Sequence, residues 1–576
     1  MSSVYLEARI PTPSRRRASG FTPRLTANRA SLATSSGRSF GRTALGVFLL
    51  AVATVARGQQ PSLAERIDQV IGRPEFRHAT FGIEFYSIDR HQLVYALNPR
   101  ELFMPASTTK LLTEGAALAL LGADFRFHTR VYRTSRLDRD GRLRGGLVLV
   151  ASGDPNLSGR IQPDGTLAFE NEDHSYGGSY YTRTVSGDPL AVLRHLAHQV
   201  AAHGVKRIDG SVLVDATLFP EGTAELGTGA VISPIVVNDN LIDVTVSPGA
   251  AEGRPVRLRI SPVTAYVQFR NEAITGAADS RPAIKFAKDT AGPDGKRIVT
   301  VIGSVPPGKP PILFNYNVPQ PSRFAEIAFV EALAAEGVAV RASVGAETSD
   351  FKGLAAFYTP ANLVAEHISP PLSEEIKVTL KVSQNLHASI VPYLLGALLA
   401  KDTTDPAQAG FDRERKWLEN AGLDLTEASQ SDGAGGSEAA FFTPDFMVQY
   451  LAFLDRQPHF PVFFRALPIL GRDGTLWNIQ TTSRAAGQVH AKTGTYTTDD
   501  LLNRNLMVTA KALAGYFTSP SGEHMAFVVY VNRVAVPPDQ DAATRIVGQA
   551  VGEIAAAGYL AAGTPAQPAT SSSPRP

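Results

Sequence analysis

The pattern of apolar and polar residues divides the chain into segments of different predicted secondary structure. From Leu63 it predicts a helix, and residues 81–88 and 92–98 read as two strands joined by a polar hairpin turn. Residues 111–122, LLTEGAALALLG, are apolar on nearly every face. This predicts a helix that is buried on all sides instead of one lying on a surface.

From about residue 123 to residue 360, short β-rich runs alternate with turns rich in glycine, proline and aspartate. The predicted strand-rich runs are residues 146–158, 208–219, 240–249, 256–269 and 296–308. Helices are expected at 189–203 and 322–336. No repeat of fixed period is present, so this region is interpreted as inserted α+β material of one or two domains.

The helical pattern returns near residue 362 and is continuous over residues 373–400. Two strands, 512–520 and 524–532, and a helix over 541–561 complete the predicted elements. The last residues, GTPAQPATSSSPRP, have the composition of a disordered tail.

The first 58 residues have the composition of an export signal. They hold nine arginines against one acid, and they end in the apolar run TALGVFLLAVATVA followed by Ala-Arg-Gly, a small-x-small cleavage pattern. An uncleaved membrane anchor is the alternative, but the run is shorter than the roughly 20 residues that span a bilayer. We therefore expect a protein exported to the periplasm or another extracytoplasmic space.

Composition narrows the class of protein further. A chain of 576 residues with 44% hydrophobic and 19% charged residues can form several domains with large cores. The absence of cysteine excludes disulfides and thiolate zinc sites. The whole chain has a net charge of +2, and its first 58 residues carry +8, so the remaining residues carry −6. This negative charge argues against nonspecific binding to nucleic acid phosphates.

One short motif carries candidate catalytic chemistry. Ser107 and Lys110, in MPASTTKLL, lie three residues apart at the start of the apolar helix, so their side chains share one face. A serine hydroxyl needs a base to become a good nucleophile, and a lysine desolvated by an apolar helix can be neutral enough to serve. The helix start also directs backbone N–H groups toward an oxyanion. A capped helix with a solvated lysine is the alternative explanation.

Two further motifs follow in the chain. Residues 383–385, Ser-Gln-Asn, offer a second hydroxyl and an amide, and residues 492–495, Lys-Thr-Gly-Thr, fall on a predicted strand. Ser-x-x-Lys, Ser-x-Asn and Lys-Thr-Gly together are the signature of penicillin-binding proteins and class A β-lactamases. The order and the local contexts all match this signature.

With these motifs the chain resembles the class C low-molecular-mass penicillin-binding proteins, the D-alanyl-D-alanine carboxypeptidase/endopeptidase family. The separation of 276 positions from Ser107 to Ser383 supports this family, because a β-lactamase has only a short helical stretch there. The resemblance implies an α/β (α+β) fold: a β-lactamase/transpeptidase-like domain, with an antiparallel sheet flanked by helices and a helical lobe, interrupted by a long α+β insertion. The expected segments are 1–58 (leader), 62–122 with 362–562 (discontinuous catalytic domain), 123–361 (insertion) and 563–576 (tail).

The resemblance also implies catalytic roles. Ser107 would attack the carbonyl of a terminal D-Ala-D-Ala bond, with Lys110 as the base. Ser383 would pass the proton to the leaving amine. Backbone N–H groups of Ser107 and Thr495 would form the oxyanion hole.

Substrate binding is implied for the remaining motif residues. Asn385 would hold the amide side of the substrate. Lys492 would add positive charge, and the hydroxyls of Thr493 and Thr495 would bind the terminal carboxylate, with Gly494 between them.

The implied function is that of an exported serine-type D-Ala-D-Ala carboxypeptidase that acts on peptidoglycan stem peptides, with DD-endopeptidase activity as an open alternative. β-Lactams would be covalent inhibitors, and no metal, organic cofactor or nucleic acid is expected. Two alternatives are a penicillin-binding module for cell-wall peptides with little turnover, and a β-lactamase. No stable membrane span is expected after removal of the leader.

The chain departs from the family pattern at several positions. Gln384 replaces the usual Asp or Asn, and Ala434 replaces a common serine. Residues 496–511 separate Thr495 from the next strand by about ten residues more than expected for the family. This longer spacing affects the expected shape of the groove rim, and so the substrate preference and not the chemistry. Gly-flanked Asp432 and Asp473 are predicted to be turn residues.

Other patterns have simpler explanations. Residues 303–310, GSVPPGKP, imitate a phosphate-binding loop, but Pro306 and Pro307 lack the N–H groups that would hold phosphates. His195 and His198 lie opposite the apolar stripe of their helix, which predicts a solvated face and not a metal site.

Overall fold

The computed structural model describes residues 61–292, 294–341, 350–400, 403–539 and 541–561. The predicted leader, 1–58, and the predicted tail, 563–576, lie outside these residues. Within the described part of the chain, no helix combines the length and the apolar character needed to cross a membrane.

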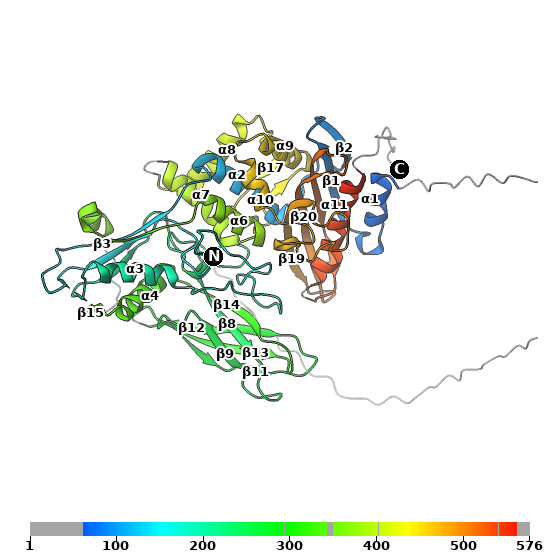
Figure 1. The fold of residues 1–576 in the computed structure, drawn as a ribbon. Coiled ribbons are helices and arrows are strands. Elements are labelled where there is room, and N and C mark those ends of the chain that lie inside the picture. The colour runs from blue at the N-terminus through cyan, green and yellow to red at the C-terminus, as the bar shows by residue number, and fades with distance from the viewer. Residues whose placement is uncertain (1–60, 293, 342–349, 401–402, 540, 562–576) are drawn as a thin grey trace, which may run out of the picture. The chain divides into compact units, whose positions relative to one another are not determined.

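An antiparallel sheet, in the order β19-β20-β21-β1-β2, forms the centre of the catalytic part (Figure 1). Its strands are β1 (Thr80–Ser87), β2 (Gln92–Leu97), β19 (Val489–Asp500), β20 (Asn505–Thr518) and β21 (His524–Asn532), with β22 (Val534–Val536) paired to β20. Nearly every residue of β1 and β21 is buried. Apolar residues predominate in both strands, as is typical of strands covered on both faces, although β1 also buries Glu84 and Ser87.

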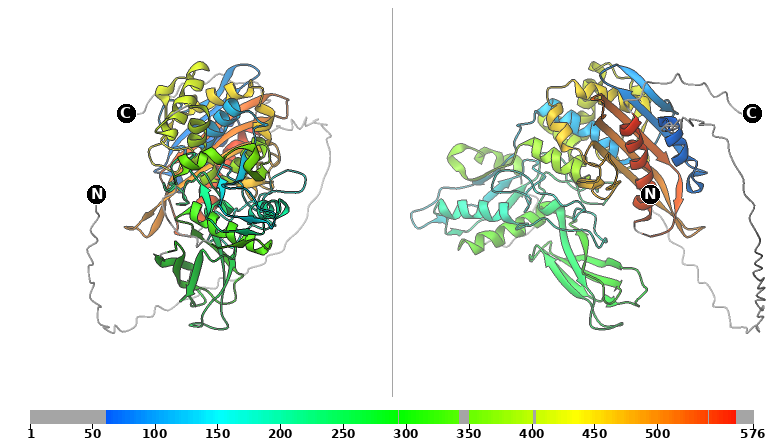
Figure 2. Two further views of the ribbon diagram at one scale, coloured as in Figure 1. Left: turned by 90° about the vertical axis from the view of Figure 1, so that its left-hand side faces the viewer. Right: turned by 45° about the vertical axis from the view of Figure 1, so that its right-hand side comes forward.

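Helices cover both faces of this sheet, as Figures 1 and 2 show. On one face, α1 (Leu63–Ile71) packs against α11 (Gln549–Ala561), and together they share a core with alternate strand residues. The other face carries the helical lobe, which has a core of its own. Its helices are α2 (Lys110–Leu121), α6 (Leu372–Val382), α7 (Asn385–Leu399), α8 (Pro406–Asn420), α9 (Pro444–Asp455) and α10 (Phe460–Ala466), with a short ladder of β17 (Ala428–Ser429) and β18 (Phe441–Phe442).

The predicted all-sided burial of the apolar helix is confirmed for α2. Every residue from Lys110 to Leu118 is buried, and the helix contacts α6, α7 and α8. Lys110 and Glu114 are thereby forced into a nonpolar interior, where their charged forms are disfavoured.

The helical pattern over residues 373–400 is not one helix, contrary to its continuous appearance. It breaks between α6 and α7 because Ser383 adopts a left-handed conformation, with φ of 65°, and ends α6. Gln384 then caps α7: its side-chain oxygen accepts hydrogen bonds from the Leu386 and His387 backbone N–H groups, at 2.7 and 3.3 Å. The second motif therefore projects from a helix junction.

The predicted insertion contains one α/β layer with a short three-stranded sheet beside it, and two smaller sheets. The layer is a sheet in the order β16-β3-β5-β7, accompanied by α3 and α4. Its elements are β3 (His128–Arg133), β5 (Leu147–Val150), α3 (Ala191–Ala202), β7 (Val212–Asp215), α4 (Pro321–Ala335) and β16 (Leu363–Ile368), with β4 (Arg142–Leu143), β6 (Arg207–Ile208), β15 (Ala339–Val340) and α5 (Phe351–Leu354) beside them. β16 pairs with β3 of this layer, although its residues follow the predicted end of the insertion at residue 361.

The two smaller sheets hold the remaining strand-rich runs. One contains β8 (Leu241–Ser247), β9 (Arg257–Ser261) and β14 (Ile312–Asn317); the other contains β10 (Val267–Asn271), β11 (Ile274–Thr275), β12 (Ala283–Ala291) and β13 (Arg297–Val305). A shared apolar cluster lies between them. All five predicted strand-rich runs contain strands, and the helices predicted at 189–203 and 322–336 are present as α3 and α4.

The additional residues 496–511 extend a hairpin and do not form a loop. Strands β19 and β20 stay paired as far as Asp500 and Asn505, and β22 pairs alongside the extension. At the tip, Leu501 and Leu502 are 86% and 91% exposed. As a result, Lys511, at the base of the extension, lies within the sheet and opposite Thr495.

Candidate active site

The predicted nucleophile lies in a strained turn just before α2. Ser107 belongs to the 3₁₀ turn Ala106–Thr109, and Ala106 has a φ of +45°, which a non-glycine residue rarely adopts. A side chain at Gly494 would come within 2.5 Å of the Pro105 carbonyl, and one at Gly435 within 2.0 Å of the Ala106 carbonyl. The two glycines therefore allow β19 and the 431–437 loop to approach the turn closely.

Lys110 connects the first two motifs. Its Nζ lies 2.8 Å from Ser107 Oγ, 2.7 Å from Asn385 Oδ1 and 2.9 Å from the Ala434 carbonyl. The contact at position 434 is made by the backbone. The alanine that stands at position 434 in place of the usual serine therefore costs Lys110 no hydrogen bond.

Burial makes Lys110 a suitable base. Desolvation lowers the pKa of Lys110 to about 8, and the more distant carboxylates of Glu225, Asp432 and Glu114 offset only part of this effect. A pKa near 8 leaves a useful fraction of neutral amine at physiological pH. An ordinary lysine would be almost fully protonated.

A second serine and lysine form an equivalent contact between the other two motifs. Lys492 Nζ lies 2.8 Å from Ser383 Oγ and 2.8 Å from the Thr493 carbonyl, and its side chain is fully buried. Burial, together with the nearby cations Lys110 and Lys511, holds the pKa of Lys492 well below its ordinary value. Proton exchange between this amine and Ser383 is therefore chemically accessible.

The rest of the third motif lies along the edge strand β19. Thr493 Oγ1 donates to Thr475 Oγ1 at 2.7 Å, and Thr495 Oγ1 accepts from Lys511 Nζ at 2.8 Å. Both hydroxyls are thus oriented by neighbours from the adjoining loop and strand. This orientation suits binding of a small anion along the strand.

A single groove brings the three motifs together. It has a volume of about 1010 Å³, which is ample for a short peptide. The catalytic part contributes Ser107, Ser383, Asn385, Thr475, Thr493, Thr495 and Lys511 to its lining. The insertion contributes Asp173, Tyr176, Thr228, Phe314 and Asn315. Lys110 and Lys492 lie beneath the lining and contact it through their amines.

The insertion also contacts the second motif directly. The Tyr176 hydroxyl donates to the Ser383 carbonyl. A side chain at Gly227 would come within 1.9 Å of Asn385 Nδ2, so any residue other than glycine would displace the Asn385 amide. Neither residue was identified from the sequence, because neither belongs to a motif of fixed spacing.

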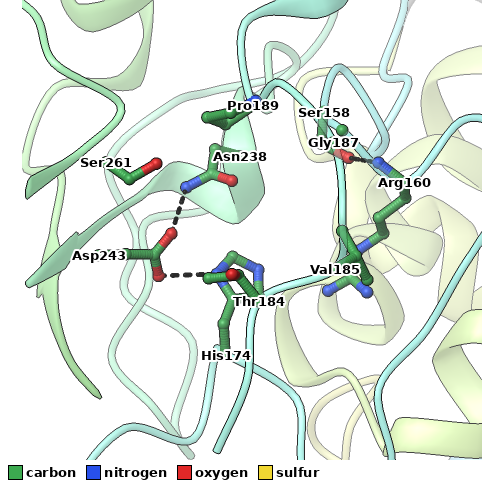
Figure 3. Close-up of a pocket in the computed structure, with 11 residues that line it drawn as sticks. Ser158, Arg160, His174, Thr184, Val185, Gly187, Pro189, Asn238, Asp243 and Ser261 are labelled. Carbon is green, nitrogen blue, oxygen red and sulfur yellow. Dashed lines mark hydrogen bonds and ion pairs between the residues drawn. The ribbon is translucent and has the colours of Figure 1, made fainter. Parts of the chain in front are cut away.

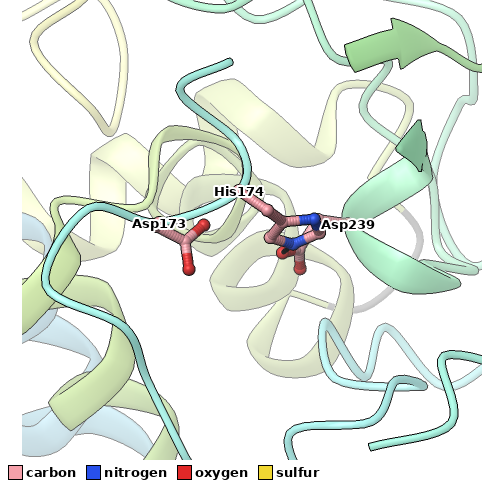
Figure 4. A group of neighbouring side chains, drawn as sticks. All are labelled: Asp173, His174 and Asp239. Carbon is pink, nitrogen blue, oxygen red and sulfur yellow. Dashed lines mark hydrogen bonds and ion pairs between the residues drawn. The ribbon is translucent and has the colours of Figure 1, made fainter. Parts of the chain in front are cut away.

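A buried charge cluster lies behind the groove. Asp239 is at its centre, with Arg160 Nη2 at 2.8 Å, His174 Nε2 at 2.6 Å and His387 Nε2 at 2.7 Å from its carboxylate oxygens. Arg160 Nη2 also lies 2.6 Å from Asp173. Ligand atoms of Asp173, His174 and Asp239 are close enough together to hold a metal ion (Figure 4). However, the Arg160 guanidinium already donates to both carboxylates and supplies the positive charge there.

The protonation states in this cluster follow from its charges. Burial alone would raise the pKa of Asp239, but Arg160 and His387 hold it well below the ordinary value. Burial likewise opposes protonation of His387, but Glu375 and Asp239 raise the pKa of His387 to about 10. At neutral pH Asp239 is therefore ionised and His387 protonated, so the two groups at the centre of the contact with α7 carry opposite charges.

The cluster extends in two directions from Asp239. On one side, His174 Nδ1 lies 2.9 Å from Asp243, and Asp243 also accepts a hydrogen bond from Asn238 Nδ2 at 3.2 Å. These three residues line a cavity of about 30 Å³ (Figure 3). A cavity of this size accommodates a water molecule. On the other side, His387 Nδ1 lies 2.8 Å from Glu375 of α6. Because His387 is in the first turn of α7, the cluster fixes the insertion against the junction that carries the second motif.

Replacing Arg160 by methionine is expected to lower the free energy of unfolding by about 3–5 kcal/mol, because two buried carboxylates lose their shared cation. Urea unfolding followed by circular dichroism measures the change. Arg415→Met is the matched control: its ion pair with Glu419 is exposed, and the expected change is below about 1 kcal/mol. Equal effects of the two substitutions would contradict a structural role for the cluster.

Residues with simpler predicted roles are also placed. Asp432 accepts hydrogen bonds from the backbone N–H groups of residues 434, 435 and 436, which confirms its turn role. Asp473 accepts from the Ile469 N–H at 2.8 Å and pairs with Lys381 Nζ at 2.7 Å. His198 is exposed and lies 3.0 Å from Glu336, in keeping with the predicted solvated face.

A serine beside a buried lysine, with a second serine and lysine in the same groove, is typical of active-site serine peptidases of the penicillin-binding class. The family model described as the D-Ala-D-Ala carboxypeptidase 3 (S13) family matches residues 63–551. The chain therefore belongs to this family, which confirms the resemblance indicated by the motifs.

Relatives and solved structures agree with this assignment. The D-alanyl-D-alanine carboxypeptidase of Actinomadura sp. (strain R39) is 29% identical, over 84% of this chain and 83% of the relative. The D-alanyl-D-alanine carboxypeptidase DacB of Haemophilus influenzae is 24% identical, over 85% and 92%. The crystal structure of penicillin binding protein 4 (dacB) from H. influenzae is similar to this fold, with a TM-score of 0.64, 19% identity, and coverage of 86% of this chain and 99% of that one. The predicted α/β (α+β) fold class is thereby confirmed.

Proposed function

We propose that the protein is an exported serine-type D-Ala-D-Ala carboxypeptidase that cleaves peptidoglycan stem peptides through an acyl-enzyme on Ser107. The observation that carries the proposal is the pair of serine–lysine contacts, each 2.8 Å, in one groove. Family membership supports the same reaction. The proposed periplasmic or other extracytoplasmic location rests on the composition of the leader and on the peptidoglycan substrate.

Acylation begins with Lys110 as the base. Its neutral amine removes the Ser107 proton, and the Ser107 oxygen attacks the carbonyl of the penultimate D-alanine. Backbone N–H groups of Ser107 and Thr495 stabilise the resulting oxyanion, an effect worth about 3–4 kcal/mol in comparable acyl transfer. Asn385, which accepts from Lys110, holds both the base and the amide side of the substrate.

Collapse of the tetrahedral intermediate requires a proton for the leaving amine. Ser383 donates it, and Lys492, 2.8 Å away, replaces it. The terminal D-alanine then departs, and water hydrolyses the ester on Ser107: the water proton passes to Ser383 and Lys492, and Lys110 returns its proton to the Ser107 oxygen, so both lysines are restored. Thr493 and Thr495 bind the terminal carboxylate before cleavage, because their hydroxyls lie along the same strand edge.

β-Lactams would acylate Ser107 by the same steps. A structure of the H. influenzae protein complexed with a β-lactam has a fold similar to this chain, with a TM-score of 0.62 and 20% identity. Opening of the lactam ring on Ser107 gives an ester in which no leaving group departs, so the adduct is expected to persist.

Two parallel measurements test the proposal. The protein is incubated with an acetylated peptide ending in D-Ala-D-Ala while released D-alanine is quantified, and a second sample is treated with penicillin and weighed by mass spectrometry. Catalytic release of D-alanine together with a stable penicillin adduct is the expected result. A D-Ala-D-Ala cross-linked dimer of stem peptides then measures endopeptidase activity.

Other outcomes separate the alternatives. A penicillin adduct without peptide turnover would identify a cell-wall peptide-binding module. Rapid hydrolysis of penicillin would identify a β-lactamase. The backbone contact from Ala434 to Lys110 favours turnover, because the base keeps its hydrogen-bond partners despite the missing hydroxyl.

A further inference from the structure

One cation of the groove belongs to no recognised motif. Lys511 lies on β20 directly opposite Thr495 of β19, and its Nζ donates to Thr495 Oγ1 at 2.8 Å. Its side chain lines the groove that contains Ser107 and Ser383, although the residue is only 6% exposed.

Within the described part of the chain, the charge of Lys511 has no acidic partner. Among the described residues, no carboxylate lies within 4.0 Å of its Nζ, and the hydroxyl of Thr495 is its hydrogen-bond partner. Burial accordingly lowers the pKa of Lys511 to about 8, with no nearby anion to oppose the shift. An ammonium in such surroundings binds an incoming anion more strongly than a solvated one does.

The other cations near the groove are already engaged or covered. Lys492 is fully buried and directs its amine to Ser383 and the Thr493 carbonyl. Arg545 lines the groove but pairs with Asp539 at 3.0 Å. Of the lysines and arginines that line the groove, Lys511 is therefore the one that has no carboxylate partner among the described residues.

The backbone next to Lys511 leaves space for its amine. Gly548 ends a π-helical stretch, Ala543–Gly548, and a side chain there would lie 3.3 Å from Lys511 Cε and 3.5 Å from Nζ. Insertions of this kind into helices are frequent at functional sites. The geometry keeps the amine beside Thr495, at the end of the groove where the third motif lies.

We propose that Lys511 is a specificity-determining residue that pairs with the free C-terminal carboxylate of the substrate, together with the hydroxyls of Thr493 and Thr495. This inference rests on the proposed function for the identity of the substrate. Lys511, which lies outside the three motifs, would thus supply the positive charge that distinguishes a terminal carboxylate from a neutral peptide end.

Binding and turnover are measured separately, so that the inference and the proposed function can fail independently. Binding of an acetylated peptide ending in D-Ala-D-Ala, as the free acid and as the C-terminal amide, is measured by calorimetry in the Ser107→Ala chain with and without Lys511→Met. Turnover of both peptides is measured with the parent chain and with Lys511→Met alone.

Lys511→Met is expected to weaken binding of the acid about 10- to 100-fold, the effect of one charge-assisted hydrogen bond, and to leave binding of the amide nearly unchanged. In turnover, KM should rise by the same factor while kcat changes little. Lys416→Met, on the exposed side of α8, is the matched control and should change none of these values. The thermal midpoint of Lys511→Met should not fall, because the substitution removes a buried charge.

Equal loss of binding for acid and amide, or no loss for either, would overturn the inference. If the Ser107→Ala chain binds the acid more tightly than the amide and loses this preference with Lys511→Met, but the parent chain releases no D-alanine, the proposed function fails and the inference stands. If the parent chain turns over both peptides equally and Lys511→Met changes neither KM, the inference fails and the peptidase activity stands.

Discussion

Ser107→Ala is expected to abolish release of D-alanine, with a loss of at least about 10⁴-fold in kcat, and to prevent formation of any penicillin adduct. The hydroxyl is the group that forms the covalent bond, and Ser383, the other serine of the motifs in the groove, is held by Lys492 at the helix junction. Released D-alanine and intact-protein mass after treatment with penicillin are the two measurements.

Ser280→Ala is the matched control for this substitution. Its hydroxyl donates to the Ala277 carbonyl within a turn of the insertion, so activity and adduct formation should be retained. Circular dichroism should show that both variants are folded. A penicillin adduct on the Ser107→Ala chain would show that another residue is the nucleophile and would remove the basis of the proposed mechanism.

The sequence predicted the three motifs that converge in the groove, but only the first motif can be explained by local geometry alone. Ser107 and Lys110 are three residues apart in one turn and helix, so their contact follows from local geometry. Contact between Ser383 and Lys492, across 109 residues of sequence, could be expected only from the resemblance to a family, since nothing local relates a helix junction to a strand.

Neither local sequence patterns nor the resemblance to a family predicts the charge cluster around Asp239. Arg160, Asp173 and His174 lie in irregular segments of the insertion, where no periodicity indicates which side chains are buried. Asp239 reaches them through three consecutive left-handed residues, Asn238, Asp239 and Asn240, a conformation that no propensity scale anticipates. Their contacts depend on the tertiary placement of the insertion against α7.

Lys511 was missed for a different reason. Residues 496–511 read as an unexplained spacer, so a lysine at the end of the spacer carried no signal. Cross-strand pairing in the extended hairpin determines that residue 511 faces Thr495. A shift of one residue in register would turn the same side chain to the opposite face of the sheet.

Lys110→Met is expected to lower the acylation rate at saturating peptide by about 10²- to 10⁴-fold, the range typical of a lost general base. In the parent chain the same rate should rise about tenfold per pH unit at acidic pH and level off above about pH 8, because the neutral amine is the active form. Measurement at saturating substrate separates this rise from any loss of charge on Lys511, which would act on KM.

Lys110→Arg separates the role of a base from that of a fixed positive charge. Arginine keeps the charge and can donate hydrogen bonds to Asn385 and to the Ala434 carbonyl, but it does not lose its proton at accessible pH. If Lys110 acts as the base, both substitutions should abolish the rise in rate toward pH 8, whereas Lys416→Met should retain it. If positive charge beside Ser107 were sufficient, Lys110→Arg would keep most of the acylation rate, and Ser107 would need another proton acceptor among the residues that line the groove.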